Sequence, residues 1–151
     1  MDNQQHEQTL TDKDTMNPTS TFEISLKVLP SDIDELGHVN NIVYLRWVQD
    51  AAVAHWQALA PARYQKEILW VVLRHEIDYK APAHKNEEVL AITWIGNARR
   101  LSFERNTEIL SKKDRTLLAR AKTIWCPVNS NTLKPQRVDQ RIRDLFSTPA
   151  S

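Results

Sequence analysis

The densest group of polar residues that could do chemistry lies in residues 31–41, which read SDIDELGHVNN. Asp34 lies four positions before His38, so a carboxylate that could act as a general base has a histidine nearby in sequence. The segment ends where a long helix is expected to begin. The first turn of a helix offers unpaired backbone N–H groups and a partial positive charge, which can stabilise a developing oxyanion. These parts together indicate an acyl-transfer site.

The same residues also have a purely structural interpretation. Asp, Gly and Asn are common in loops that precede helices, and Asp34 could simply accept hydrogen bonds from backbone amides. Either Asn40 or Asn41 could cap the helix by accepting from an N–H two or three residues further on. Residue types and spacing alone leave both interpretations open.

The helix that must position this loop is predicted over residues 42–59, which contain no Gly or Pro. Its polar side chains fall on one narrow stripe at 3.6-residue spacing, while apolar residues occupy the remaining positions. The stripe consists of Arg46, Gln49, Asp50 and Gln57. We therefore expect the helix to be mostly enclosed by the rest of the domain.

Strands are expected on both sides of the helix in the sequence. Residues 22–28 and 73–79 alternate apolar and polar side chains, which is typical of half-buried strands. Further strand patterns cover residues 88–95, 101–109 and 116–128, and Gly96-Asn97 indicates a hairpin turn. The order of one strand, one helix and four strands predicts an α+β fold in which an antiparallel sheet wraps one helix.

Length and composition exclude several classes of protein. A chain of 151 residues suits one domain, and 20 Lys+Arg against 19 Asp+Glu leave a net charge of +1, without the basic excess of a nucleic-acid binder. No apolar run is long enough to cross a membrane, and no secretory signal is evident, so we expect a soluble, cytoplasmic protein. Cys126 is the only cysteine and no histidines have metal-ligand spacing, so no metal site is expected.

The chain divides into three parts. Residues 1–20 are polar and are expected to form a disordered N-terminal tail. Residues 21–130 are assigned to the folded domain, and residues 131–151 to a C-terminal extension that can form one short helix.

The stretch DIDELGHVNNIVYL, residues 32–45, resembles the signature of hotdog-fold acyl-CoA thioesterases, the 4-hydroxybenzoyl-CoA thioesterase-like superfamily. It is most similar to the branch that reads D-x-D-x-x-G-H-V-N-N. Weaker similarity continues through IDYKAP at residues 77–82. The resemblance implies a curved antiparallel sheet around the long helix, self-association as a homodimer or homotetramer, and active sites at the dimer interface. It also implies an acyl-CoA substrate and no cofactor, since coenzyme A is part of that substrate.

The resemblance also assigns roles to the residues of this motif. Asp34 matches the catalytic aspartate, which acts as a general base for water or as a nucleophile through a mixed anhydride. The oxyanion donor falls on a backbone N–H near Asn41, and His38 matches a histidine that assists the carboxylate. The substrate-binding residues that the motif implies are Gly37, Asn40 and Tyr44, of which Gly37 would allow a tight turn.

The sequence departs from the family pattern at two places. Leu36 stands where some relatives carry an asparagine, so the aspartate–asparagine–histidine arrangement is incomplete. Many relatives carry a helix glutamate at the position of Gln49, which makes its neighbour Asp50 a reserve candidate for the base. Two other functions stay open: an enoyl-CoA hydratase, whose motif has a five-residue Asp–His spacing, and a non-catalytic module that binds acyl-CoA or acyl-carrier protein.

Other residues of note are predicted to belong to the core. His55 and His75 lie on apolar faces of their elements, where a hydrogen-bonded core histidine is more common than a ligand. The chain has five tryptophans, two or three of which could line a substrate tunnel or a dimer interface.

Overall fold

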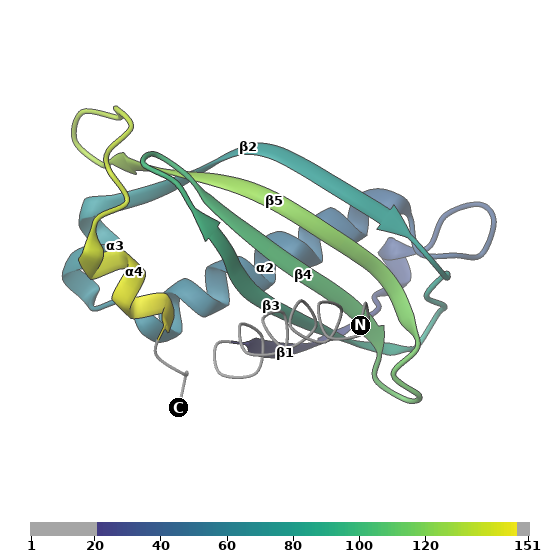
Figure 1. The fold of residues 1–151 in the computed structure, drawn as a ribbon. Coiled ribbons are helices and arrows are strands. Elements are labelled where there is room, and N and C mark those ends of the chain that lie inside the picture. Colours follow the sequence, from purple (N-terminus) through teal and green to yellow (C-terminus); the bar gives the residue numbers. More distant parts are fainter. Residues whose placement is uncertain (1–20, 148–151) are drawn as a thin grey trace, which may run out of the picture.

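The computed structural model describes residues 21–147, and the expected N-terminal tail lies outside this range. A five-stranded antiparallel sheet and one long helix form most of the molecule (Figure 1). The elements, in chain order, are β1 (Phe22–Lys27), the short 3-10 helix η1 (Pro30–Asp32), α2 (Asn41–Leu59), α3 (Ala62–Glu67), β2 (Ile68–Tyr79), β3 (Glu88–Ala98), β4 (Phe103–Ser111), β5 (Leu117–Asn129) and α4 (Gln140–Ser147). The strand order in the sheet is β1-β3-β4-β5-β2, so β1 and β2 are its two edges.

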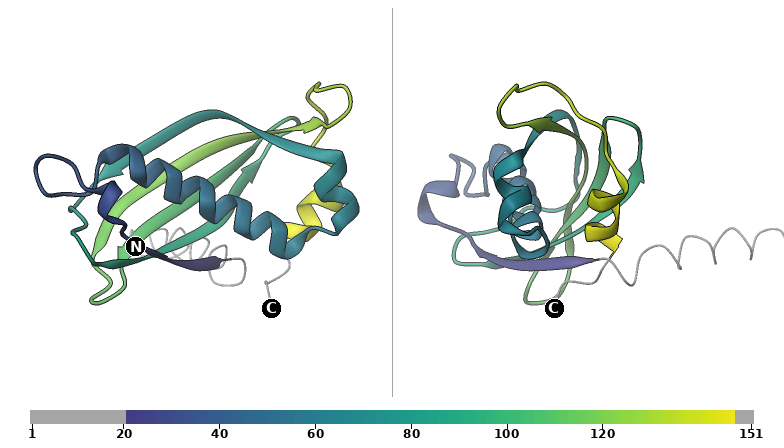
Figure 2. Two further views of the ribbon diagram at one scale, coloured as in Figure 1. Left: turned by 180° about the vertical axis from the view of Figure 1, so that it is seen from behind. Right: turned by 90° about the vertical axis from the view of Figure 1, so that its left-hand side faces the viewer.

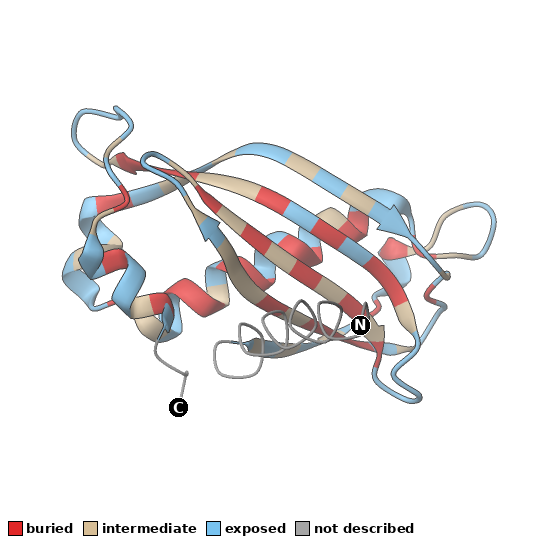
Figure 3. Ribbon diagram, in the orientation of Figure 1, coloured by how far each residue is buried: buried red, intermediate tan, exposed pale blue. Residues whose placement is uncertain are grey.

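The sheet is curved, and α2 crosses its hollow side (Figure 2). Tyr44, Trp47 and Val48 from the helix pack in one cluster with Ala91 and Ile109 from the sheet. Along β4, buried residues alternate with more exposed ones, as expected for a strand with one face on the core (Figure 3). This arrangement confirms the predicted α+β hotdog fold.

The prediction that α2 is mostly enclosed is wrong. The sheet covers one side of the helix only, and the opposite side is exposed along its whole length. Ile42 and Val53 are exposed and lie on the same stripe as the polar residues, at positions three or four residues from them. The outer face of α2 therefore carries apolar as well as polar side chains.

Two details of the chain after α2 also differ from the predictions. A short helix, α3, precedes β2 where only strands were expected. Gly96 and Asn97 lie inside β3, and the chain turns at residues 99–102 instead, where the Arg99 N–H donates to the Ser102 carbonyl at 2.8 Å. The sequence thus correctly predicts a hairpin between β3 and β4, but it places the turn at residues 96–97 instead of 99–102.

A bulge in β2 explains a third difference. The pairing with β5 shifts register between Val72 and Arg74, so the residues facing the core change from even to odd numbers. Leu73, expected to face inward, is 60% exposed. His75 lies beyond the bulge, is half-buried and bonds the Thr123 hydroxyl at 2.9 Å, as expected for a core histidine.

Helix α4 packs onto the domain rather than extending from it. Ile142 and Phe146 are buried against Trp56, Ile68 and Phe103, which closes a second apolar cluster at the C-terminal end of α2. The short helix expected in residues 131–151 is therefore present.

Candidate active site

Asp32 anchors the loop that precedes α2. Its side chain is only 1% exposed, and its two oxygens accept from different partners. Arg46 donates to Oδ1 at 3.0 Å, and the Leu29 N–H donates to Oδ2 at 2.9 Å. The first aspartate of the D-x-D pair therefore holds the loop against the helix.

Asp34 has a different environment. Its Oδ1 accepts from the N–H of Leu36 at 2.9 Å and of His38 at 3.3 Å, which fixes the side chain in a turn. Within residues 21–147, no group donates to its Oδ2. The turn closes at Gly37, whose φ of +78° suits a glycine and whose N–H donates to the Asp34 carbonyl at 3.1 Å. One oxygen of Asp34 thus stabilises the turn, as the structural interpretation expects. The other oxygen stays available for chemistry.

The start of α2 is capped by Asn40, whose side-chain oxygen accepts from the Ile42 N–H at 3.2 Å. Asn41 is the first residue of the helix. In the described part of the chain, no acceptor takes the Asn41 N–H, which leaves it as the free donor of the first turn. This resolves which asparagine caps the helix and which one offers a backbone donor.

A cavity of about 400 Å³ brings most of the candidate residues together. Its lining consists of Asp34, Leu36, His38, Val39, Asn40, Asn41, Tyr44, Tyr79, Lys80, Ala81 and Pro82. Five of the six residues that the motif suggests therefore share one cavity. Gly37 does not line it and shapes the turn instead.

Two tyrosines of this cavity hold neighbouring backbone. The Tyr44 hydroxyl accepts from the Ala83 N–H at 2.9 Å, and the Tyr79 hydroxyl donates to the Asn41 carbonyl at 2.9 Å. Burial is the main reason that the pKa of each tyrosine lies above its ordinary value, so both are neutral phenols at neutral pH. Tyr79 was not predicted to line this cavity, although the IDYKAP segment that contains it carries part of the family resemblance.

His38 lies beside Asp34 but does not bond its carboxylate through the ring. The backbone N–H of His38 donates to the Asp34 carboxylate, and the His38 carbonyl accepts from the Asp34 N–H at 2.8 Å. The His38 imidazole instead packs edge to face on His84, with ring centroids 5.4 Å apart. The two side chains share the cavity without forming a dyad in this state. Asp34 and His38 therefore line the same cavity as two separate side chains.

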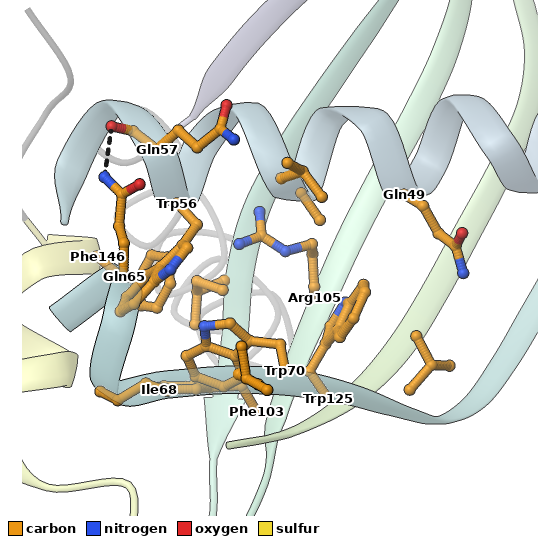
Figure 4. A pocket seen from close by; sticks show the side chains of 15 residues that line it. Gln49, Trp56, Gln57, Gln65, Ile68, Trp70, Phe103, Arg105, Trp125 and Phe146 are labelled. Carbon is orange, nitrogen blue, oxygen red and sulfur yellow. Dashed lines mark hydrogen bonds between the residues drawn. The ribbon is translucent and has the colours of Figure 1, made fainter. Parts of the chain in front are cut away.

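The reserve base and its neighbour lie elsewhere. Asp50 is on the exposed outer face of α2, and neither it nor Gln49 lines the cavity of Asp34. Gln49 lines a second cavity of about 560 Å³ near the C-terminal half of the helix (Figure 4). Residues 21–147 contain no group of three or more side chains that could hold a metal ion, and none of their helices is long and apolar enough to cross a membrane.

Comparisons with known proteins agree with the motif. The sequence profile of the thioesterase-like superfamily matches residues 28–146. A search among curated protein sequences gives no match.

Among solved structures, the fold is similar to those of three thioesterases. The first is a 4-hydroxybenzoyl-CoA thioesterase variant solved with 4-hydroxybenzoyl-CoA. For this thioesterase the TM-score is 0.77 at 18% identity, covering 84% of this chain and 99% of that one. A thioesterase from Thermus thermophilus, solved with coenzyme A and zinc, gives 0.74 at 22% identity, with 85% and 98% covered. A 1,4-dihydroxy-2-naphthoyl-CoA thioesterase from Synechocystis gives 0.72 at 23% identity, with 83% and 95% covered. At these identities the likeness concerns the fold.

Proposed function

Because the chain belongs to the thioesterase-like superfamily, we propose that it hydrolyses an acyl-CoA thioester to a carboxylic acid and free coenzyme A. The observation that carries the proposal is the shared cavity of Asp34 and Asn41. Within residues 21–147, Asp34 Oδ2 has no donor and the Asn41 N–H has no acceptor, and a carboxylate base and an oxyanion donor are the two groups that thioester hydrolysis needs.

The reaction follows from these two groups. Asp34 Oδ2 takes a proton from water, the water oxygen attacks the thioester carbonyl, and the Asn41 N–H donates to the oxyanion that forms. When the tetrahedral intermediate collapses, the C–S bond breaks and the sulfur of coenzyme A takes the proton held by Asp34. Attack by Asp34 itself would instead give a mixed anhydride that water then hydrolyses. Neither route requires a cofactor besides the coenzyme A of the substrate.

The test is release of free thiol from a panel of short, medium, long-chain and aromatic acyl-CoAs. We expect turnover of at least one member, and the preferred acyl group will report the shape of the pocket. A folded protein that binds acyl-CoA but releases no thiol across the panel would contradict hydrolysis and support the non-catalytic binding module.

We further propose that the protein is a homodimer that pairs through β2, with a tetramer built from such dimers as the larger alternative. β2 bonds only β5 within the described chain, so its other edge presents unpaired backbone groups. Leu69, Val71 and Leu73 on this strand are 44–60% exposed, a concentration of apolar side chains on an open edge. We place this assembly in the cytoplasm, in keeping with the single cysteine of the chain.

Charge on this edge is expected to separate the subunits. The Val71→Lys/Leu73→Lys variant should elute as a monomer in size-exclusion chromatography with light scattering, because lysines on an edge strand oppose strand pairing. Leu101→Lys, which changes an exposed leucine in the β3–β4 turn, is the matched control and should keep the wild-type mass. A wild-type protein that is monomeric at micromolar concentration would contradict the dimer.

A further inference from the structure

The cavity at the C-terminal half of α2 has apolar walls and a charged group inside. Aromatic side chains from α2, three strands and α4 surround it, as Figure 4 shows. These are Trp56, Trp70, Phe103, Trp125 and Phe146. A volume of about 560 Å³ lies in the range of small-molecule sites.

Arg105 on β4 directs its guanidinium into this cavity among the aromatic rings (Figure 4). The residue is 3% exposed, and no carboxylate within residues 21–147 forms an ion pair with it. Burial lowers its pKa to about 9, so it still carries its charge at neutral pH. A buried cation without a counterion is costly for a fold to keep.

The neighbours of Arg105 do not neutralise it. Its Nη1 donates to His55 Nδ1 at 3.0 Å and to the Thr93 hydroxyl at 3.0 Å. Burial, followed by the charge of Arg105, lowers the pKa of His55 to about 3, so His55 is a neutral acceptor. Both partners serve to orient the guanidinium and supply no negative charge.

The hydrogen-bond donors of the cavity indicate which chemical group it can bind. Nη1 makes both hydrogen bonds, and the guanidinium carbon lies 5.5 Å from the centroid of the Phe146 ring. Within residues 21–147, Nε and Nη2 of Arg105 donate no hydrogen bond, and this edge matches the two oxygens of a carboxylate. The indole Nε1 atoms of Trp70 and Trp125 are buried, and no acceptor for them is found among residues 21–147. Each such buried donor without an acceptor destabilises the fold, and an incoming acceptor would remove that penalty.

We propose that this cavity binds a carboxylate carried on an apolar or aromatic body, with Arg105 as its charge partner and the Trp70 and Trp125 indoles as further donors. The inference rests on the proposed function, because thioester hydrolysis supplies two sources of such a ligand. One is an acyl group that carries a second carboxylate at its distal end, and the other is a free carboxylic acid such as the product. Asn41 and Gln49, which line the two cavities, are eight residues apart on α2, about 12 Å along the helix axis.

The first arm of the test measures binding without turnover. Benzoate and suberate are titrated into the full chain and followed by tryptophan fluorescence, since three of the five tryptophans line the cavity. We expect saturable changes with both acids, none with methyl benzoate, and at least tenfold weaker binding in Arg105→Gln. Arg120→Gln, which removes an exposed arginine from β5, is the control and should bind like wild type.

Two milder variants keep the test valid if Arg105→Gln fails to fold. Trp70→Phe and Trp125→Phe each remove one indole N–H and retain an aromatic ring, and each should weaken carboxylate binding about three- to tenfold. Equal affinity for the acids in all three variants, or no binding of either acid, would overturn the proposal.

The second arm identifies the source of the carboxylate. Hydrolysis of an acyl-CoA with a distal carboxylate is compared with hydrolysis of its methyl ester. A preference for the free carboxylate of tenfold or more, lost in Arg105→Gln, supports the acyl source, whereas inhibition by benzoate without that preference supports the free acid. Carboxylate binding without any hydrolysis would refute the proposed function but not the carboxylate site. Hydrolysis without any effect of a carboxylate would refute the carboxylate site but not the proposed function.

Discussion

Replacement of Asp34 by asparagine is expected to lower the kcat of thiol release at least about a hundredfold while leaving the free energy of unfolding nearly unchanged. Asparagine keeps an oxygen that can accept from the N–H groups of Leu36 and His38, so the turn should survive. It loses the second carboxylate oxygen, which has no donor within residues 21–147 and which we propose as the base. The measurement pairs the kinetics of the preferred acyl-CoA with urea unfolding of the same samples.

Glu35→Gln provides the matched control for this prediction. Glu35 is the next residue in the same loop, is exposed and does not line the cavity, so the same loss of one charge should change kcat less than threefold. If Asp34→Asn retained activity close to wild type, Asp34 would not be the base, and His38 would become the leading candidate.

The grouping of the candidate residues in this loop could be predicted from the sequence because it is local. The spacing of Asp34, His38 and Asn41 within eight residues, just before a long helix, already suggested that they meet. The sequence could not tell which aspartate is structural, because Asp32 is distinguished by its contact with Arg46, fourteen residues away on the helix. Nor could the sequence show that one oxygen of Asp34 accepts hydrogen bonds within the turn while the other has no donor within residues 21–147.

The second cavity was out of reach for a different reason. The three donors proposed to bind the ligand lie on β2, β4 and β5, and the pairing of these neighbouring strands brings Trp70, Arg105 and Trp125 together. One signal was present: Arg105 alternates with Phe103, Thr107 and Ile109 on the inward face of its predicted strand, where a charged residue is unusual. The bulge at Val72 has no such signal, since it depends on pairing with β5.

Acidification is expected to destabilise the fold through His55. Burial and the charge of Arg105 lower the pKa of His55 from 6.5 to about 3 in the folded state. Above pH 6.5 the ring is neutral in both the folded and the unfolded chain and has no effect. Below that pH the unfolded chain binds a proton that the folded chain excludes, so stability falls as the pH falls. The loss is about 1.4 kcal/mol per pH unit, or about 2–3 kcal/mol between pH 6.5 and pH 4.5.

His55→Asn isolates this contribution. The asparagine oxygen can accept from Arg105 Nη1 as the ring nitrogen does, but the side chain does not titrate. The variant should be less stable than wild type at pH 7.5, because it loses the stacking of His55 on Phe22 at 4.9 Å, and its free energy of unfolding should depend less on pH. Urea unfolding at several pH values between 7.5 and 4.5 measures both effects. His84→Asn is the control, because it removes an exposed histidine and keeps the buried network. The stability difference between wild type and His55→Asn should shrink by about 2–3 kcal/mol over this range. A constant difference would mean that His55 gains its proton as readily in the folded chain as in the unfolded one, and that burial and the charge of Arg105 do not lower its pKa.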